Sequence, residues 1–168
     1  MKNSLVALAV LACVRTAGAA ILCPTTVQPG DQFAAEVTLD TGFSALGAYS
    51  VMLNYDPSAV TVVTVDGGSA PEFTVPPVVN TFAPGSLVIS DFQAHSLTSP
   101  SGTVSVARVN LTAARFRITS MQIVVRSVYD TDAVAIPGVV GGSCTIIRRR
   151  HSPPPLRART QGGITKRP

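Results

Sequence analysis

Apolar and polar residues alternate with a period of two in several short segments of the chain. In residues 32–40 ("QFAAEVTLD"), Phe33, Ala35, Val37 and Leu39 fall on one side of the alternation. Successive side chains of a β-strand point to opposite faces, so this pattern predicts a strand with one buried side.

Residues 46–58 ("LGAYSVMLNYDPS") predict a second strand that ends abruptly. One face carries apolar and aromatic side chains: Tyr49, Val51, Leu53 and Tyr55. The other face carries smaller or more polar ones: Ala48, Ser50, Met52 and Asn54. Proline cannot donate a ladder hydrogen bond and aspartate caps turns, so Asp56-Pro57 is predicted to end the strand rather than to form a site.

The same alternation, with enrichment in β-branched residues, predicts further strands in four segments: 60–65, 86–94, 103–113 and 141–147. A change of phase at Ala107-Arg108 leaves room for a β-bulge. Residues 115–130 are compatible with one strand or two. Residues 69–85 contain four prolines and are predicted to form a loop or a ragged sheet edge, and residues 96–102 form a loop by composition.

No segment of 11 residues or more shows helical periodicity. Eight or nine short strands separated by turn signals are typical of an antiparallel β-sandwich. The sequence therefore predicts an all-β fold, with one domain spanning residues 22–147.

The first 19 residues have the pattern of a secretory signal peptide. Lys2 precedes an apolar run from Leu5 to Val14, and Ala17-Gly18-Ala19 forms a cleavage site of small residues. A run of about ten residues is too short to span a bilayer. Two alternatives remain open: a buried first strand or helix, and a lipoprotein signal at Cys13. The signal predicts export to the extracellular space or cell surface, and no membrane span.

Charge is distributed unevenly along the chain. All nine acidic residues lie between Asp31 and Asp132, whereas residues 148–168 hold seven of the 13 basic residues and no acid. This terminal segment is also rich in proline, which predicts a disordered tail or linker. A basic tether for an anionic cell-surface polymer or for nucleic acid is the other interpretation. The acidic domain argues against nucleic acid as its partner.

Two cysteines remain if the signal peptide is removed. Cys23 and Cys144 flank the predicted domain, and export makes a disulfide between them chemically feasible. The alternative is a pair of buried free thiols.

The chain carries no recognisable catalytic or metal-binding motif. The two histidines, His95 and His151, lie in a predicted loop and in the tail, and most acidic residues sit at strand ends, where they cap turns. Asp130-Thr131-Asp132 lacks the glycine and terminal glutamate of a calcium-binding loop. The sequence therefore predicts no enzyme, no catalytic residue, no metal site and no cofactor. There is no Trp, so sugar stacking would depend on three candidate surface aromatics: Phe82, Phe92 and Tyr129.

An ordered set of motifs resembles the cohesin family of bacterial extracellular modules. "VQPGDQFAAEVTLD" is followed by "LGAYSVMLNYDPSAVTVVTVDGG", and later by "PGSLVISDF" and "GTVSVARVNLTA". The resemblance covers residues 26–147. It implies a nine-stranded β-sandwich of jelly-roll type whose terminal strands are close together. Cohesins bind dockerins, which are calcium-loaded helical modules on polysaccharide-degrading enzymes, and the family implies no catalysis.

The resemblance also indicates where a partner would bind. The dockerin-facing sheet includes the outward side of the strand before Tyr55-Asp56-Pro57, which predicts a partner-binding face made of Ala48, Ser50, Met52, Asn54, Ser90 and Phe92. The family uses polar side chains there to bond the dockerin, whereas Ala48 has no hydrogen-bonding side chain and Ser50 has only a hydroxyl. Two other functions remain open: a carbohydrate-binding module of the same fold that binds polysaccharide, and a structural module of a truncated surface protein.

Overall fold

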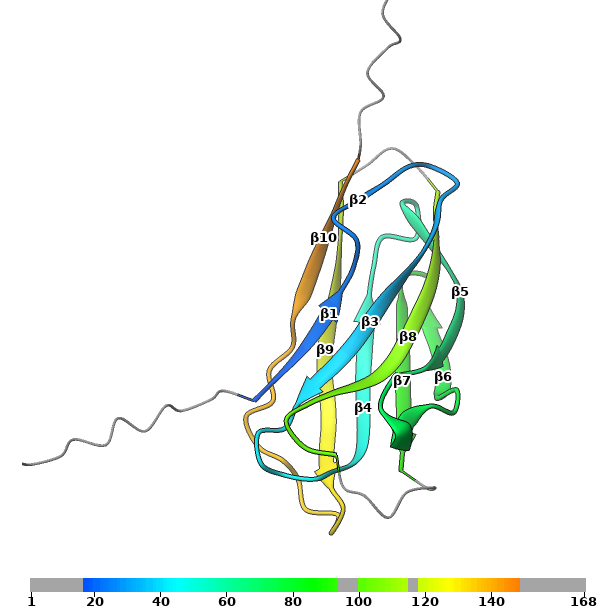
Figure 1. The fold of residues 1–168 in the computed structure, drawn as a ribbon. Helices are drawn as coiled ribbons and strands as arrows, with labels where there is room; N and C mark the ends of the chain where they lie inside the picture. The colour runs from blue at the N-terminus through cyan, green and yellow to red at the C-terminus, as the bar shows by residue number, and fades with distance from the viewer. Residues whose placement is uncertain (1–16, 94–99, 115–117, 149–168) are drawn as a thin grey trace, which may run out of the picture.

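The computed structural model describes residues 17–93, 100–114 and 118–148. Within them, ten strands and one short 3₁₀-helix form two sheets that pack face to face (Figure 1). The strands are β1 (Gly18–Leu22), β2 (Thr26–Val27), β3 (Gln32–Asp40), β4 (Leu46–Asn54), β5 (Val60–Gly67), β6 (Val78–Ala83), β7 (Ser86–Phe92), β8 (Thr103–Ala113), β9 (Thr119–Asp130) and β10 (Ser143–Arg148), and the helix η1 is Pro71–Phe73.

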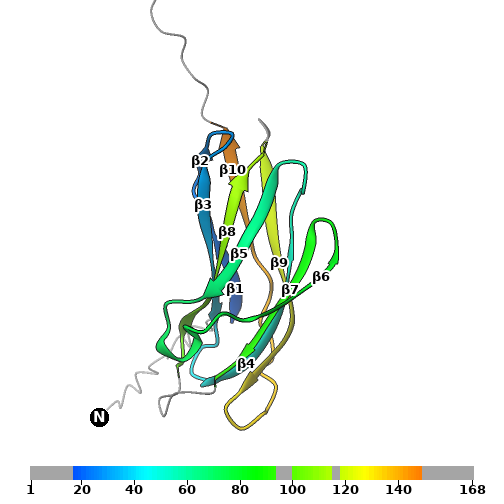
Figure 2. The ribbon, with the colours of Figure 1, turned by 90° about the vertical axis from the view of Figure 1, so that its right-hand side faces the viewer.

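One sheet has the strand order β1-β3-β8-β5, and the other has the order β2-β10-β9-β4-β7-β6. In Figure 2, β3 and β8 lie in one layer and β7 and β9 in the other. Every strand pair is antiparallel except β2 with β10, which pair in parallel over two residues. The predicted all-β antiparallel sandwich is confirmed.

The core consists of the inward side chains of both sheets. Val37 and Leu39 of β3 and Val51 and Leu53 of β4 are fully buried, as the alternation predicts. Tyr49 connects the two sheets, because its hydroxyl donates a hydrogen bond of 3.0 Å to the Val106 carbonyl on β8. Burial and, to a lesser extent, the charge of Asp91 raise the pKa of the Tyr49 hydroxyl.

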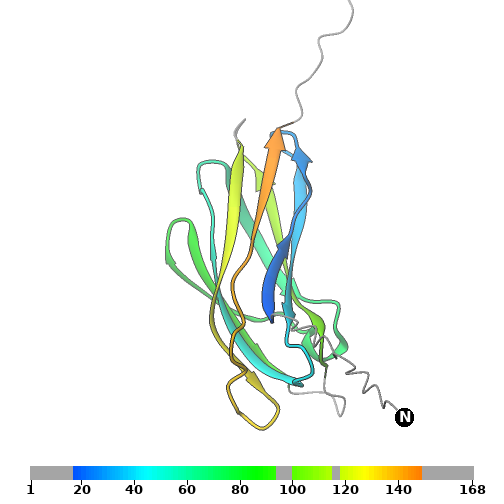
Figure 3. The same ribbon diagram turned by 90° about the vertical axis from the view of Figure 1, so that its left-hand side faces the viewer.

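The chain ends of the domain meet at one side of the sandwich. Figure 3 shows β10, in orange, beside β1, in dark blue, and the Ala19 amide donates a hydrogen bond of 2.7 Å to the Val140 carbonyl. Cys23 and Cys144 are joined by a disulfide bond, with their Cα atoms 6.1 Å apart. That separation is within the range of about 4.4–6.8 Å that a disulfide requires.

Asp56 ends β4 by capping the following turn. Its Oδ1 accepts hydrogen bonds from the Ser58 amide at 2.8 Å and the Ser58 hydroxyl at 2.7 Å. Its carbonyl also accepts from the Ala59 and Val60 amides. The carboxylate therefore has a structural role in this turn.

Several details differ from the sequence prediction. The bulge in β8 lies at Val106-Ala107, one residue earlier than expected, and places two buried side chains in succession. Within residues 69–85, Val78–Ala83 form the edge strand β6, whose residues are all exposed. Beyond residues 115–117, which are not described, the segment up to Asp130 forms the single strand β9.

The start of the domain also differs. β1 begins at Gly18, four residues before the expected start at 22, and so includes the last two residues of the predicted signal peptide. Residues 1–16 and the tail from 149 onward lie outside the described residues. Among the residues that are described, no helix has the length and apolar character needed to cross a membrane.

Candidate partner-binding face

The predicted partner-binding residues all lie on the outer face, which we define as the side of the six-stranded sheet that points away from the core. In the register of β4 and β7, Ala48 is opposite Phe92, Ser50 is opposite Ser90, and Met52 is opposite Val88. Their chain neighbours on β4 point into the core. Two adjacent strands thus bring together the six residues: Ala48, Ser50, Met52, Asn54, Ser90 and Phe92.

β9 extends the outer face on the other side of β4. Tyr129 is opposite Ala48, Ser127 is opposite Ser50, Val124 is opposite Met52, and Gln122 is opposite Asn54. Arg126 is an extra residue between the pairs Val125–Val51 and Ser127–Ser50, so it forms a bulge in β9. The centre of the face is therefore built from small and apolar side chains.

One end of the outer face is aromatic. The side chains of Phe92 and Tyr129, 64% and 40% exposed, come from strands on either side of Ala48. Together with Gly47 and Gln93 they line a pocket of about 480 Å³. The small Ala48 side chain leaves space between the two rings, which an apolar side chain of a partner can fill.

Two side-chain contacts connect different strands across the middle of the outer face. The Ser90 hydroxyl donates a hydrogen bond of 2.9 Å to the Ser50 hydroxyl. The Arg126 guanidinium carbon lies 5.9 Å from the centre of the Phe82 ring. This distance is within the range of a cation–π interaction.

A sequence profile for the cohesin domain matches residues 20–143. The chain belongs to the cohesin family. This match confirms the family assigned from the motifs. A comparison with curated protein sequences finds no match to the chain.

Solved cohesins share the fold. A cohesin module from a family 33 glycoside hydrolase of Clostridium perfringens has a TM-score of 0.67 at 14% identity, covering 79% of this chain and 96% of that one. The sixth cohesin of scaffoldin B from Acetivibrio cellulolyticus, solved in complex with a mutant dockerin, has a TM-score of 0.63 at 16% identity, covering 80% and 100%. A non-cellulosomal cohesin from the archaeon Archaeoglobus fulgidus has a TM-score of 0.54 at 16% identity, covering 77% and 91%.

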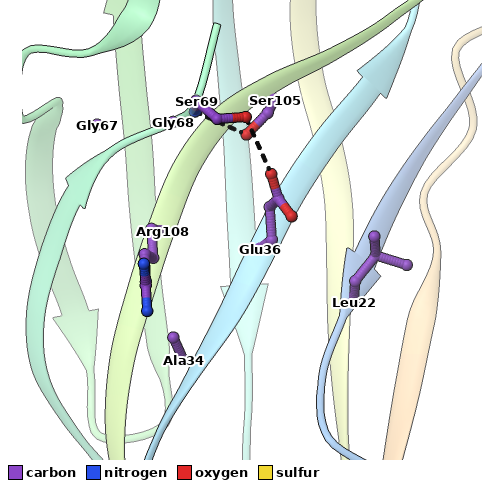
Figure 4. A pocket seen from close by; sticks show the side chains of 8 residues that line it. All are labelled: Leu22, Ala34, Glu36, Gly67, Gly68, Ser69, Ser105 and Arg108. Carbon is purple, nitrogen blue, oxygen red and sulfur yellow. Dashed lines mark hydrogen bonds between the residues drawn. The ribbon is translucent and has the colours of Figure 1, made fainter.

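The opposite surface of this cohesin, on the four-stranded sheet, carries a groove with both polar and apolar lining residues. This groove has a volume of about 520 Å³. Figure 4 shows its lining residues, with the Glu36 carboxylate pointing toward Ser69 and the Arg108 side chain pointing away from Glu36. The Ser69 amide donates a hydrogen bond of 2.9 Å to the Ser105 hydroxyl, and the Ser69 hydroxyl donates one of 3.4 Å to Glu36. None of the predicted partner-binding residues lines this groove.

The acidic turn that was considered for metal binding has a structural role. Asp130 Oδ1 accepts hydrogen bonds from the Asp132 and Val134 amides, which makes it a turn cap. No group of three or more histidine, cysteine, aspartate or glutamate side chains in the described ranges is placed to hold a metal ion. His95 and His151 lie outside those ranges.

The sequence does not predict the position of two residues on the outer face. Phe82 is a candidate surface aromatic by sequence, in a segment expected to form a loop or a ragged sheet edge. Arg126 lies in a segment whose strand phase was undecided. A strand signal at 78–83 ("VVNTFA"), where valine, threonine and phenylalanine follow the two prolines, would have placed Phe82.

Proposed function

We propose that this cohesin docks a dockerin-bearing protein through the outer face of its six-stranded sheet. The observation that carries the proposal is the set of apolar side chains that the face exposes around small residues, with Phe82 71% exposed, Phe92 64% exposed and Tyr129 40% exposed. Exposed apolar patches of this kind mark interaction surfaces. Family membership supports a dockerin as the partner.

The proposal includes the setting of this interaction. The module is exported by the signal peptide of residues 1–19, folds from the part of β1 that remains after cleavage to residue 147, and carries residues 148–168 as a basic tail or linker. It binds rather than catalyses, and it brings its partner into extracellular polysaccharide degradation. The signal pattern and the family's role support this setting.

Calorimetric titration of single calcium-loaded dockerin modules into the oxidised protein tests the proposal. Ser50→Arg places a large cation at the centre of the outer face and should weaken binding at least about tenfold, because the partner can no longer approach the sheet. Thr61→Arg makes the same kind of change at an exposed position on β5 of the other sheet, and should leave the affinity unchanged. Equal effects of the two variants would contradict the proposed face.

Polysaccharide binding, the alternative raised by the sequence, has less support. The chain has no Trp, and the Phe82 ring on the outer face already contacts Arg126. Sugar stacking on this face would depend on Phe92 and Tyr129. Retardation on a polysaccharide gel that Phe92→Ala abolishes would favour this alternative over dockerin binding.

A further inference from the structure

The contact between Arg126 and Phe82 crosses the outer face. Arg126 belongs to β9 and Phe82 to β6, and the strand order places both β4 and β7 between them. The two side chains must therefore extend toward each other over the middle of the sheet to bring the guanidinium carbon within 5.9 Å of the ring centre.

The strand register shows what lies beneath this contact. Arg126 projects between the rows of Ser50 and Val51, whereas Phe82 lies at the rows of Leu87 and Ser86. A line between them passes over the row formed by Met52 and Val88. Val88 is on the outward side of β7, yet it is only 7% exposed. Val88 lies between Met52 on β4 and Asn80 on β6, in the row that the Arg126–Phe82 contact crosses.

The pairing leaves the charge of Arg126 available. The guanidinium has five N–H donors, and an electrostatic contact with one ring occupies none of them as a hydrogen bond. Arg126 makes no hydrogen bond or ion pair with any described residue. The contact with Phe82 thus restricts the side chain without satisfying its donors.

Among the described residues, Arg126 is the charged side chain at the centre of the outer face, and no carboxylate lies beside it. The nearest acidic residues on these strands are Asp91 and Asp130, at the ends of β7 and β9. Asp91 is in register with the buried Tyr49, and Asp130 caps a turn. A partner that covers this face would bury an unpaired cation, which is unfavourable unless the partner supplies an anion.

We infer that Arg126, held over the Met52–Val88 row by Phe82, selects dockerins whose docking helix presents an aspartate or glutamate among apolar side chains. The carboxylate accepts a bidentate hydrogen bond from the N–H groups of Arg126, a geometry that lysine cannot provide. The apolar neighbours of that acidic residue pack on Met52, Val124 and the pocket between Phe92 and Tyr129. This inference rests on the proposed function and adds the chemistry of the partner.

The test uses a panel of single calcium-loaded dockerin modules, titrated into the oxidised protein. Arg126→Glu should weaken the tightest complex at least about 30-fold, because it places two carboxylates together in the interface. Arg108→Glu, the same change on the opposite sheet, should leave the affinity within about twofold. Replacing the acidic residue of the dockerin helix by arginine should restore binding to Arg126→Glu and weaken binding to the unmodified protein.

The role of Phe82 is tested by a double-mutant cycle. Phe82→Leu keeps the position apolar but removes the ring, and should weaken binding about fivefold by releasing Arg126. In the Arg126→Gln background, Phe82→Leu should have little further effect. Additive losses would show that Phe82 contributes only apolar area and would overturn its positioning role.

The outcomes separate the two claims. Suppose that a dockerin binds, but that Arg126→Glu and Arg108→Glu change its affinity equally or that the charge swap does not restore binding. The selection by Arg126 is then wrong, and the proposed docking face is unaffected. If no dockerin in the panel binds the unmodified protein, both the inference and the proposed function are overturned.

Discussion

Tyr49 is a residue whose polar group is needed for stability rather than for chemistry. Its hydroxyl is buried and bonded to the Val106 carbonyl of the facing sheet, and its ring packs edge-on against Phe73 with the centroids 5.7 Å apart. Tyr49→Phe keeps the ring and leaves the carbonyl without its partner, so we expect a loss of about 1–2 kcal/mol in the free energy of unfolding.

Urea denaturation of the oxidised protein measures this loss. Tyr55→Phe is the matched control, since Tyr55 is half-buried at the end of the same strand. An effect of Tyr55→Phe as large as that of Tyr49→Phe would show that the inter-sheet bond contributes nothing specific.

The same hydroxyl predicts a dependence of stability on alkaline pH. Burial raises the pKa of Tyr49 in the folded state, so the folded protein keeps this proton while the unfolded chain loses it above about pH 10. The unfolded state then binds fewer protons, and stability falls as the pH rises, by up to about 1.4 kcal/mol per pH unit. Denaturation midpoints of the unmodified protein should fall more steeply between pH 10 and 12 than those of Tyr49→Phe. Parallel slopes would contradict the prediction.

At the scale of elements, alternation predicted the strands that have one buried side. β3, β4, β7 and β8 were found close to their expected bounds, because each carries apolar side chains on its core side over most of its length. β6 was missed as a strand because all its residues are exposed. β1 was only an alternative interpretation, because Gly18 and Ala19 also fit the end of a signal peptide.

Residues of the candidate site could be predicted only where their strands could be predicted. Phase alone placed Ala48, Ser50, Met52 and Asn54 on one side of their strand, and the resemblance to cohesins indicated the face that they share with Ser90 and Phe92. The contribution of β9 could not be predicted, since the bulge at Arg126 changes its phase, and a contact between β9 and β6 depends on a strand order that local sequence does not encode.

The last strand is an element that we expect to depend on its disulfide. β10 pairs with β9 over four residues and with β2 over two. The Cys23–Cys144 bond closes a separation of 121 residues, for which the loop-entropy model gives about 4–5 kcal/mol. The double variant Cys23→Ser/Cys144→Ser should lose about 2–5 kcal/mol, and amide exchange should increase most in β10.

Reduction of the unmodified protein provides the control for this variant, since it should bring its stability to that of the double variant. A variant as stable as the oxidised protein would show that the bond adds nothing to closure of the domain.

At the scale of the whole molecule, the structure shows what the predicted processing would remove. Cleavage after Ala19 takes away Gly18 and Ala19, which pair with Asp40 and Leu39, and with them the hydrogen bond from Ala19 to Val140. Ala20, Ile21 and Leu22 remain paired with β3, and Cys23 still ties the start of the domain to β10.

We therefore expect a chain of residues 20–148 to fold with the disulfide formed, and to be less stable than a chain of residues 17–148 by about 1–3 kcal/mol, the contribution of a few backbone hydrogen bonds. Urea denaturation of the two purified chains gives this difference, and the N-terminal sequence of exported protein gives the cleavage site. If the shorter chain does not fold, processing after Ala19 is incompatible with the domain, and cleavage must occur before Gly18.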